Sequence, residues 1–256
     1  MGEILADEIC GVEALKEEWA EALKERLAGL GVEADARAPQ RLAAYHELLA
    51  DWNTRLNLTR DADFEDALDR HYMDSLAPLS LGLFPQGASV VDVGTGAGFP
   101  GLPLAIARPD LTVVLLDSLQ KRLKFLDAVI EALELTNVRT VHARAEDGGR
   151  DPALREGVDV AVSRAVAPLP ALLELTLPFV RVGGESVCYK GPGAADELDA
   201  GARAAHLLGG ERPRLIPVAV PCQPEWQHCV VVSHKREKTA RQYPRKAGTP
   251  SRSPLA

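Results

Sequence analysis

The chain has 256 residues, of which 46% are hydrophobic and 26% charged, as expected for a globular protein of one large domain or two small ones. The formal net charge of −8 taken alone argues against a nucleic acid or an anionic membrane as partner. The charge is unevenly distributed, however: residues 234–256 hold seven Lys or Arg and one acid and carry +6, which leaves −14 on the first 233 residues. The basic C-terminal segment therefore needs an explanation separate from that of the acidic body.

Several classes of protein are excluded by simple patterns. The sequence has no run of about 18 apolar residues, so we expect no membrane span. The acidic start, Met1–Cys10, lacks the basic and apolar parts of a secretory signal, and the few cysteines indicate reduced thiols in the cytoplasm. Cys222, His228, Cys229 and His234 are spaced unlike a common zinc site, so we expect no metal.

The first third of the chain is predicted to be helical. Apolar residues recur every three or four positions over Val12–Ala28 and again from Pro39 to Leu56, which gives each helix one apolar face. A third helical region, Asp63–Leu83, is expected to break near Pro78. We interpret residues 1–85 as a helical extension that packs on the rest of the protein.

From Ala88 onward, short β-branched runs alternate with helical patterns, which predicts βαβ units and a mostly parallel sheet with helices on both faces. The expected strands are Ser89–Val93, Thr112–Leu116, Val138–His142, Val158–Ser163 and Ser186–Lys190. Leu215–Val220 and Cys229–Ser233, separated by a proline-rich connection, predict a closing antiparallel hairpin. We therefore expect an α/β domain over residues 86–234, followed by a flexible basic tail over residues 235–256.

A glycine-rich loop follows the first expected strand and precedes a helix. Its segment Gly96–Gly101 satisfies the dinucleotide-binding pattern G-x-G-x-x-G, and the helix that opens near Pro100 is expected to offer free N–H groups to a ligand. Asp117 lies 21 residues after Gly96, at the end of the next strand, where a carboxylate accepts hydrogen bonds from ribose hydroxyls. This loop alone does not distinguish NAD from S-adenosylmethionine.

Two further features favour S-adenosylmethionine. Asp92, two residues before the first glycine, is better placed for an amino-acid ammonium group than for a pyrophosphate, and Ala145-Glu146 follows the third strand, where it would flank an adenine. The pattern resembles the class I S-adenosylmethionine-dependent methyltransferases. The alternatives are an NAD(P)-dependent oxidoreductase and a non-catalytic RNA-binding or assembly protein on the same fold.

Further segments narrow the resemblance. They are Asn57-Leu58-Thr59, Arg70–Leu76, Asp92–Pro103, Leu115–Arg122, Ser163-Arg164-Ala165, Tyr189-Lys190-Gly191 and Tyr243–Pro250. Together they resemble the bacterial ribosomal RNA small subunit methyltransferase G family, also called glucose-inhibited division protein B, from about Leu42 to Pro250. The resemblance implies a Rossmann-like fold with a seven-stranded sheet, and methylation of guanosine N7 in the 530 loop of 16S ribosomal RNA. The expected substrate is the RNA, the 30S subunit or an assembly intermediate, and we expect a monomer.

The resemblance and the loop pattern together name a set of cofactor-binding residues. These are Asp92, Gly94, Gly96, Gly98, Phe99, Asp117, Ser118, Leu119, Ala145, Glu146 and Arg164, with Arg164 at the mouth of the active site. Guanine N7 carries a free lone pair and attacks the sulfonium methyl without losing a proton, so no general base is expected and catalysis is a matter of positioning.

Cationic side chains, together with the Tyr243 ring as a stacking surface, are expected to hold the RNA. The candidates are Arg60, Arg70, His71, Arg122, Lys190, Lys235, Arg236, Arg241, Tyr243, Arg245 and Lys246. His71 lies near Asp74 in the chain, and we interpret it as a hydrogen-bonded helix residue rather than an acid/base catalyst. For the tail we expect ordering on RNA, so that deletion of residues 235–256 weakens RNA binding and leaves cofactor affinity unchanged.

Overall fold

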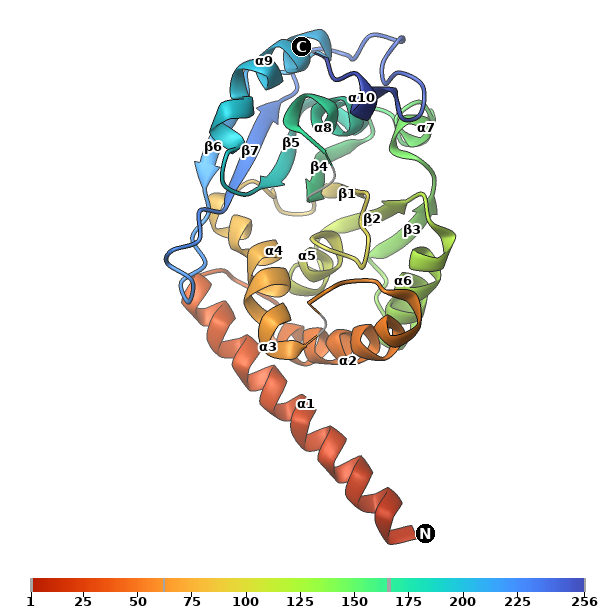
Figure 1. Ribbon diagram of the computed structural model, residues 1–256, viewed down its shortest axis with the longest axis vertical. Helices are drawn as coiled ribbons and strands as arrows, with labels where there is room; N and C mark the ends of the chain where they lie inside the picture. Colours follow the sequence, from red (N-terminus) through yellow and green to blue (C-terminus); the bar gives the residue numbers. More distant parts are fainter. Residues whose placement is uncertain (1, 62, 165–166, 256) are drawn as a thin grey trace.

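The computed structural model describes residues 2–61, 63–164 and 167–255, and it contains one seven-stranded sheet (Figure 1). The strand order is β3-β2-β1-β4-β5-β7-β6. Neighbours among β1 to β5 run parallel, whereas β7 is antiparallel to both β5 and β6. The strands are β1 Ser89–Val93, β2 Thr112–Asp117, β3 Val138–His142, β4 Val158–Arg164, β5 Val180–Lys190, β6 Arg214–Pro217 and β7 Cys229–His234. The predicted parallel sheet with a C-terminal antiparallel hairpin is confirmed.

Helices cover both faces of this sheet (Figure 1). Those of the N-terminal part and the first βαβ units are α1 Gly2–Leu30, α2 Ala38–Leu56, α3 Phe64–Ala67, α4 Asp74–Leu76, α5 Gly101–Ala107 and α6 Gln120–Ala132. Those that follow are α7 Ala145–Gly148, α8 Leu169–Thr176, α9 Leu198–Leu207 and α10 Thr249–Arg252. Four short segments complete the set, the π-helix η1 Leu68–Met73 and the 3-10 helices η2 Ala77–Leu81, η3 Leu177–Phe179 and η4 Ala194–Glu197.

The alternation of side chains along β1 explains why both faces need a helical cover. Val90 is buried in the cluster that includes apolar residues of α2, α5 and α6, whereas Val91 and Val93 are buried in the opposite cluster with Leu175 of α8. Because successive strand residues point to opposite faces, an unbroken apolar run is stable only in a sheet covered on both sides.

The N-terminal helices bury the faces that their periodicity predicts. Leu23, Leu42 and Leu49 are fully buried in the same cluster as the sheet residues, and the Trp19 ring stacks on Phe64 at 4.8 Å between centroids. Helix α1 begins at Gly2, earlier than the pattern predicts, and ends before Gly31, whose φ is +65°. The expected third helical region is confirmed as the consecutive segments α3, η1, α4 and η2, and it changes to a 3-10 helix at Ala77, next to Pro78.

The C-terminal segment corrects the expectation of a flexible tail. Lys235 is fully buried, and its Nζ donates to the carbonyl of Leu177 at 2.6 Å. Arg155 donates to the carbonyls of Thr239 and Tyr243 at 2.7 and 2.8 Å. The segment lies against the body because it carries hydrogen-bond partners for polar groups that would otherwise be buried alone.

Candidate functional site

The glycine loop joins β1 to α5 and is held against the end of β2. The backbone N–H groups of Gly94 and Thr95 both donate to the carbonyl of Leu116, at 2.8 and 3.1 Å. Gly98 has a φ of +109°, and a Cβ there would lie 2.8 Å from the Tyr45 hydroxyl. Only glycine meets both the backbone and the space requirement at this position.

Asp92 stabilises the glycine loop through hydrogen bonds to its backbone and to one of its side chains. Its carboxylate is fully buried, and Oδ2 accepts hydrogen bonds from the Thr95 hydroxyl at 2.7 Å and from the Gly101 N–H at 2.9 Å. The first N–H of α5 is therefore used inside the protein, which corrects the expectation that this helix start is offered to a ligand. Oδ1 has no hydrogen-bond partner within the described residues, and burial raises the pKa of Asp92 to about 6.

Asp117, at the end of β2, connects the glycine loop to the start of α6. Its Oδ2 accepts from the N–H of Gly96 at 3.0 Å, and its Oδ1 accepts from the N–H of Leu119 at 2.8 Å. Arg122 reaches back from α6, with Nη1 3.3 Å from Asp117 Oδ2. Because each carboxylate oxygen accepts more than one hydrogen bond, Asp117 keeps acceptor capacity for hydroxyl groups of a ligand.

A cavity of about 390 Å³, here called the cofactor cavity, opens above these residues. The predicted residues that line it are Gly94, Asp117, Ser118, Ala145, Glu146 and Arg164. The lining described for it does not include the other predicted residues, Asp92, Gly96, Gly98, Phe99 and Leu119. The lining combines two carboxylates and three arginines with apolar side chains. The carboxylates suit a ligand with hydroxyl groups, the apolar side chains suit a flat ring, and the volume lies in the range of small-molecule sites, so these residues fit an adenosine cofactor.

The C-terminal segment forms part of the cofactor cavity, which the sequence did not indicate. Gly248 and Ser251 line it, and the Gly248 N–H donates to Glu146 Oε1 at 2.6 Å. Arg144 and Arg122 also line it, although Arg122 is predicted as an RNA contact. No local pattern connects residues 248 and 146, since they are more than 100 positions apart and meet only through tertiary packing.

Arg164, at the end of β4, is held from three directions. Its Nη1 donates to Asp74 Oδ2 at 3.0 Å and to the carbonyl of Arg70 at 3.1 Å, and its guanidinium lies 5.0 Å from the centroid of the Phe99 ring. Phe99 in turn stacks on His71 at 4.7 Å between centroids. The fixed guanidinium lines the cofactor cavity on one side and a second cavity on the other.

This second cavity, here called the target cavity, has a volume of about 270 Å³. It is lined by Asp74, Arg164, Tyr189, Lys190, Gly191, Pro192, Glu197 and His228. Lys190 Nζ lies 2.7 Å from Glu197 Oε1, so this predicted RNA contact is paired with an acid inside the protein. The target cavity therefore combines a flat aromatic side chain with charged groups that are already fixed in place.

The ionisable groups beside the target cavity are poorly suited to proton transfer near neutral pH. Burial, with a smaller contribution from the Arg164 charge, lowers the pKa of His71 to about 4, and the ring nitrogen Nε2 lies 2.9 Å from the Thr59 hydroxyl. Burial alone would raise the pKa of Asp74, but the hydrogen bond with His228 and the charge of Arg164 outweigh it and lower that pKa. A neutral His71 and an ionised Asp74 agree with the interpretation of His71 as a structural residue.

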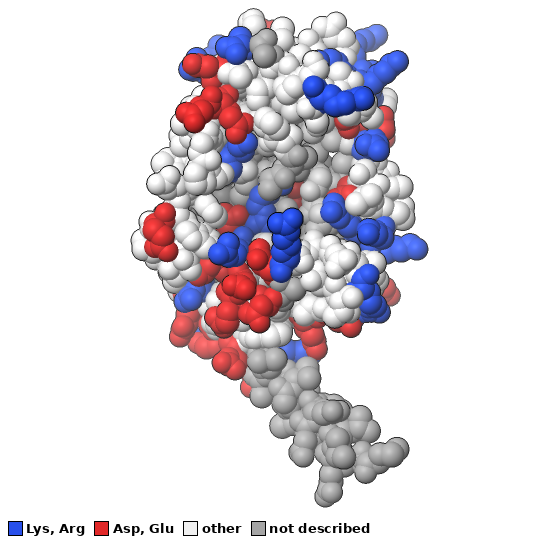
Figure 2. Space-filling model, viewed as in Figure 1, with Lys and Arg blue, Asp and Glu red and all other residues white. Residues whose placement is uncertain are grey.

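The predicted RNA contacts divide into exposed and enclosed groups. Arg60, Arg70, Arg236, Arg241 and Lys246 are exposed. The structure corrects three others: Lys235 is fully buried, Tyr243 is 9% exposed, and Arg245 forms hydrogen bonds to the buried carboxylate of Glu174. On the face seen in Figure 2, basic side chains gather at the centre and along the side of α6 and α7, and acidic ones gather over α3.

Two negative findings apply to the residues that the structure describes. None of the described helices is both long and apolar enough to cross a membrane. Among the residues whose side chains the structure describes, no three His, Cys, Asp or Glu side chains gather where they could hold a metal ion.

Comparisons with known proteins identify the family. The family model described as rRNA small subunit methyltransferase G matches residues 38–221. A "Ribosomal RNA small subunit methyltransferase G" of Acetivibrio thermocellus is 43% identical over 91% of this chain and 95% of its own length. A protein of the same name from Desulfitobacterium hafniense is 43% identical over 88% of this chain and 93% of its own length. A solved S-adenosylmethionine-dependent methyltransferase of Aquifex aeolicus is 18% identical over 65% of this chain and 92% of its own, with a TM-score of 0.48. From the family model and the two relatives, we conclude that the chain belongs to the ribosomal RNA small subunit methyltransferase G family.

Proposed function

We propose that this protein transfers the methyl group of S-adenosylmethionine to N7 of a guanosine in the 530 loop of 16S ribosomal RNA. The observation that carries the place of transfer is the position of Arg164, which lines both the cofactor cavity and the target cavity, whereas the atom N7 and the 530 loop are what the family resemblance implies. A residue shared by two adjoining cavities lies where two reactants would meet. Membership in a methyltransferase family favours S-adenosylmethionine over NAD(P) as the occupant of the first cavity.

The cofactor side is supported by the two buried acids. Asp117 would hold the ribose hydroxyls, and Glu146 and Ala145 would frame the adenine, since all three line the cofactor cavity. When bound, S-adenosylmethionine supplies an electrophilic methyl group. Asp92 stays our candidate for the ammonium group through its unpartnered Oδ1, although it is not among the residues that line the cavity.

The target side is supported by its size, its aromatic wall and its charges. The guanine would lie in the target cavity against Tyr189, and Arg164 would orient it while Asp74 and the Arg70 carbonyl keep the guanidinium fixed. The new N–CH₃ bond forms as the C–S bond breaks, which moves one positive charge onto the guanine ring. The carboxylates of Asp74 and Glu197 line the same cavity and would offset the charges of Arg164 and Lys190, so that these cations do not oppose the new charge on the guanine.

The proposed RNA surface includes the exposed residues Arg70, whose own carbonyl contacts Arg164, and Arg60, which follows Thr59, a hydrogen-bond partner of His71. The substrate would be the RNA itself, the 30S subunit or an assembly intermediate. Phosphate contacts of this kind make RNA affinity fall as salt concentration rises.

The decisive experiment maps 7-methylguanosine at nucleotide resolution in 16S ribosomal RNA from a strain that lacks the protein, before and after incubation with purified protein and S-adenosylmethionine. We expect one guanosine of the 530 loop to gain the modification. An unmodified 530 loop under conditions in which the protein binds S-adenosylhomocysteine would refute the substrate assignment while preserving the cofactor assignment.

Two variants and one control sharpen this experiment. Gly94→Asp places a charged side chain in the cofactor cavity at a residue with a φ of +74°, so cofactor binding and methylation should both be lost. Arg164→Lys should bind S-adenosylhomocysteine but methylate slowly, because lysine keeps a single nitrogen near Asp74 and the Arg70 carbonyl but lacks the planar guanidinium that lies over the Phe99 ring. Arg212→Ala, which removes an exposed side chain paired with Asp199, should behave as the unmodified protein.

A further inference from the structure

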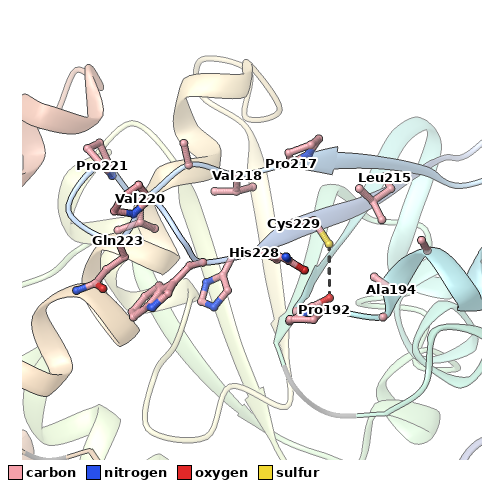
Figure 3. A pocket seen from close by; sticks show the side chains of 17 residues that line it. Pro192, Ala194, Leu215, Pro217, Val218, Val220, Pro221, Gln223, His228 and Cys229 are labelled. Carbon is pink, nitrogen blue, oxygen red and sulfur yellow. Dashed lines mark hydrogen bonds between the residues drawn. The ribbon is translucent and has the colours of Figure 1, made fainter.

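A third and larger cavity, here called the flanking cavity, lies beside the target cavity and has a volume of about 660 Å³ (Figure 3). One wall is the connection between β6 and β7, from Pro217 to Cys229, and the opposite wall is the turn from Gly191 to Ala195. In Figure 3, Val218, Val220 and His228 lie on the first wall, and Pro192 and Ala194 lie on the second. Most of the first wall lies beyond the residues matched by the family model, which end at 221.

The flanking cavity is lined by an aromatic pair, and a cation that is not part of its lining lies over one of the two rings. The rings of Trp226 and His228 lie 4.8 Å apart at an angle of 30°, and the Arg70 guanidinium carbon lies 5.6 Å from the Trp226 ring centroid. Trp226 is only partly buried and Arg70 is exposed. Aromatic faces with an arginine beside them are the usual means by which proteins hold unpaired nucleobases, because every base offers a flat π-face.

The first wall of the flanking cavity is held by hydrogen bonds within the protein. The backbone N–H of Val218 donates to the carbonyl of His228 at 2.9 Å, and that of Trp226 donates to the carbonyl of Gln223 at 3.0 Å. The Gln223 side chain donates to Asp69 Oδ2 at 2.9 Å, which ties the connection to η1. A rigid slot loses little entropy when it binds a flat ring.

The flanking cavity adjoins the target cavity. The two share Gly191, Pro192 and His228 as lining residues. His228 Nδ1 lies 2.8 Å from Asp74 Oδ1, and the other oxygen of the same carboxylate accepts from Arg164. A single strand of RNA whose guanine occupied the target cavity would therefore place a neighbouring base within reach of Trp226.

We propose that the flanking cavity binds the base of a nucleotide next to the target guanosine, by stacking against Trp226 and His228 with Arg70 beside them. The inference rests on the proposed function, because the occupant is identified by the position of this cavity next to the target cavity. Its consequence is sequence context: the enzyme would recognise a splayed, single-stranded neighbour as well as the guanine itself.

The test uses protein labelled with 5-fluorotryptophan, which gives fluorine resonances from Trp19, Trp52 and Trp226. Addition of an RNA fragment that contains the 530 loop should shift the Trp226 resonance, assigned with Trp226→Phe. Trp226→Ala should lower RNA affinity roughly 5- to 150-fold, the cost of one lost base stack, and should raise KM for RNA more than it lowers kcat. Trp226→Phe, which keeps a stacking ring, should stay within roughly threefold of the unmodified protein.

The controls separate this inference from the proposed function. Affinity for S-adenosylhomocysteine and the unfolding midpoint should be unchanged in Trp226→Phe, which keeps the test valid if Trp226→Ala is unstable. An RNA with an abasic neighbour should bind the unmodified protein and Trp226→Ala equally weakly. If the protein methylates the 530 loop but both Trp226 variants retain full affinity and the resonance does not move, the inference is refuted and the proposed function survives. Absence of methylation by the unmodified protein refutes the proposed function instead.

Discussion

The pair formed by Glu174 and Arg245 gives the most quantitative prediction for the C-terminal segment. Glu174 is completely buried in α8, and its carboxylate accepts from Arg245 Nη2 at 2.6 Å, from Nε at 2.9 Å and from the backbone N–H at 2.8 Å. Arg245→Ala removes the two side-chain donors and leaves a buried carboxylate with only the backbone donor. Breaking a buried pair in this way costs about 3–5 kcal/mol.

We expect the lower end of that range, about 3 kcal/mol, because the backbone N–H of residue 245 remains and the Arg245 side chain is itself 26% exposed. That loss lowers the ratio of folded to unfolded protein by more than about a hundredfold. With a urea m-value of about 3 kcal/mol per molar, the midpoint of unfolding should fall by about 1 M. Equilibrium urea titration followed by circular dichroism measures this shift.

The same variant should weaken cofactor binding. Gly248 follows Arg245 by three residues and donates to Glu146 in the cofactor cavity. If the C-terminal segment is displaced, the hydrogen bond from Gly248 to the Glu146 carboxylate is lost. A hydrogen bond of this kind is worth about 1.5 kcal/mol, which corresponds to about a tenfold rise in the Kd for the cofactor. Calorimetric titration with S-adenosylhomocysteine, at a temperature where the variant is folded, gives this value.

Two controls decide whether the reasoning holds. Arg241→Ala removes an exposed arginine from the same segment and should change the free energy of unfolding by less than about 0.5 kcal/mol. Glu174→Met combined with Arg245→Met should lose less stability than Arg245→Ala, because no unpaired charge stays buried. The reasoning is refuted if Arg245→Ala and Arg241→Ala have equal unfolding midpoints and equal cofactor affinities. Deletion of residues 235–256 should also weaken cofactor binding, which replaces the expectation drawn from the sequence alone.

Three further predictions concern buried groups. The pKa of Asp92 is raised to about 6, so the native state binds more protons than the unfolded chain between pH 4 and 6. The free energy of unfolding should therefore fall as pH rises through this range. Asp92→Asn should reduce the slope of that fall, measured by urea titration at several pH values. Burial lowers the pKa of Lys235 to about 8, so stability should rise from pH 8 to 10, and Lys235→Met should flatten the rise in the same assay. Gly98→Ala should cost about 1–3 kcal/mol by thermal unfolding, because the added Cβ meets the Tyr45 hydroxyl at 2.8 Å.

The agreement between pattern and structure is best where the determining interactions are local. The strands around Val91 and the glycine turn at Gly98 follow from alternation, β-branched runs and backbone geometry, all of which act within a few residues. The predicted acids Asp117 and Glu146 do line one cavity, because parallel strands end at the same edge of the sheet. To predict that these two acids lie close together, it was enough to know that each follows a predicted strand of the same parallel sheet.

The sequence by itself therefore determined the fold class and the family, and it singled out two acids, Asp117 and Glu146, that line one cavity. It did not determine the position of the C-terminal segment, because seven basic residues in 23 look the same whether they face RNA or a buried acid. Tertiary structure alone brought Arg245 to Glu174 and Gly248 to Glu146, pairs that are 71 and 102 residues apart. The charge of +6 in the tail is thus partly internal, since burial of a carboxylate in α8 requires a cation from elsewhere in the chain.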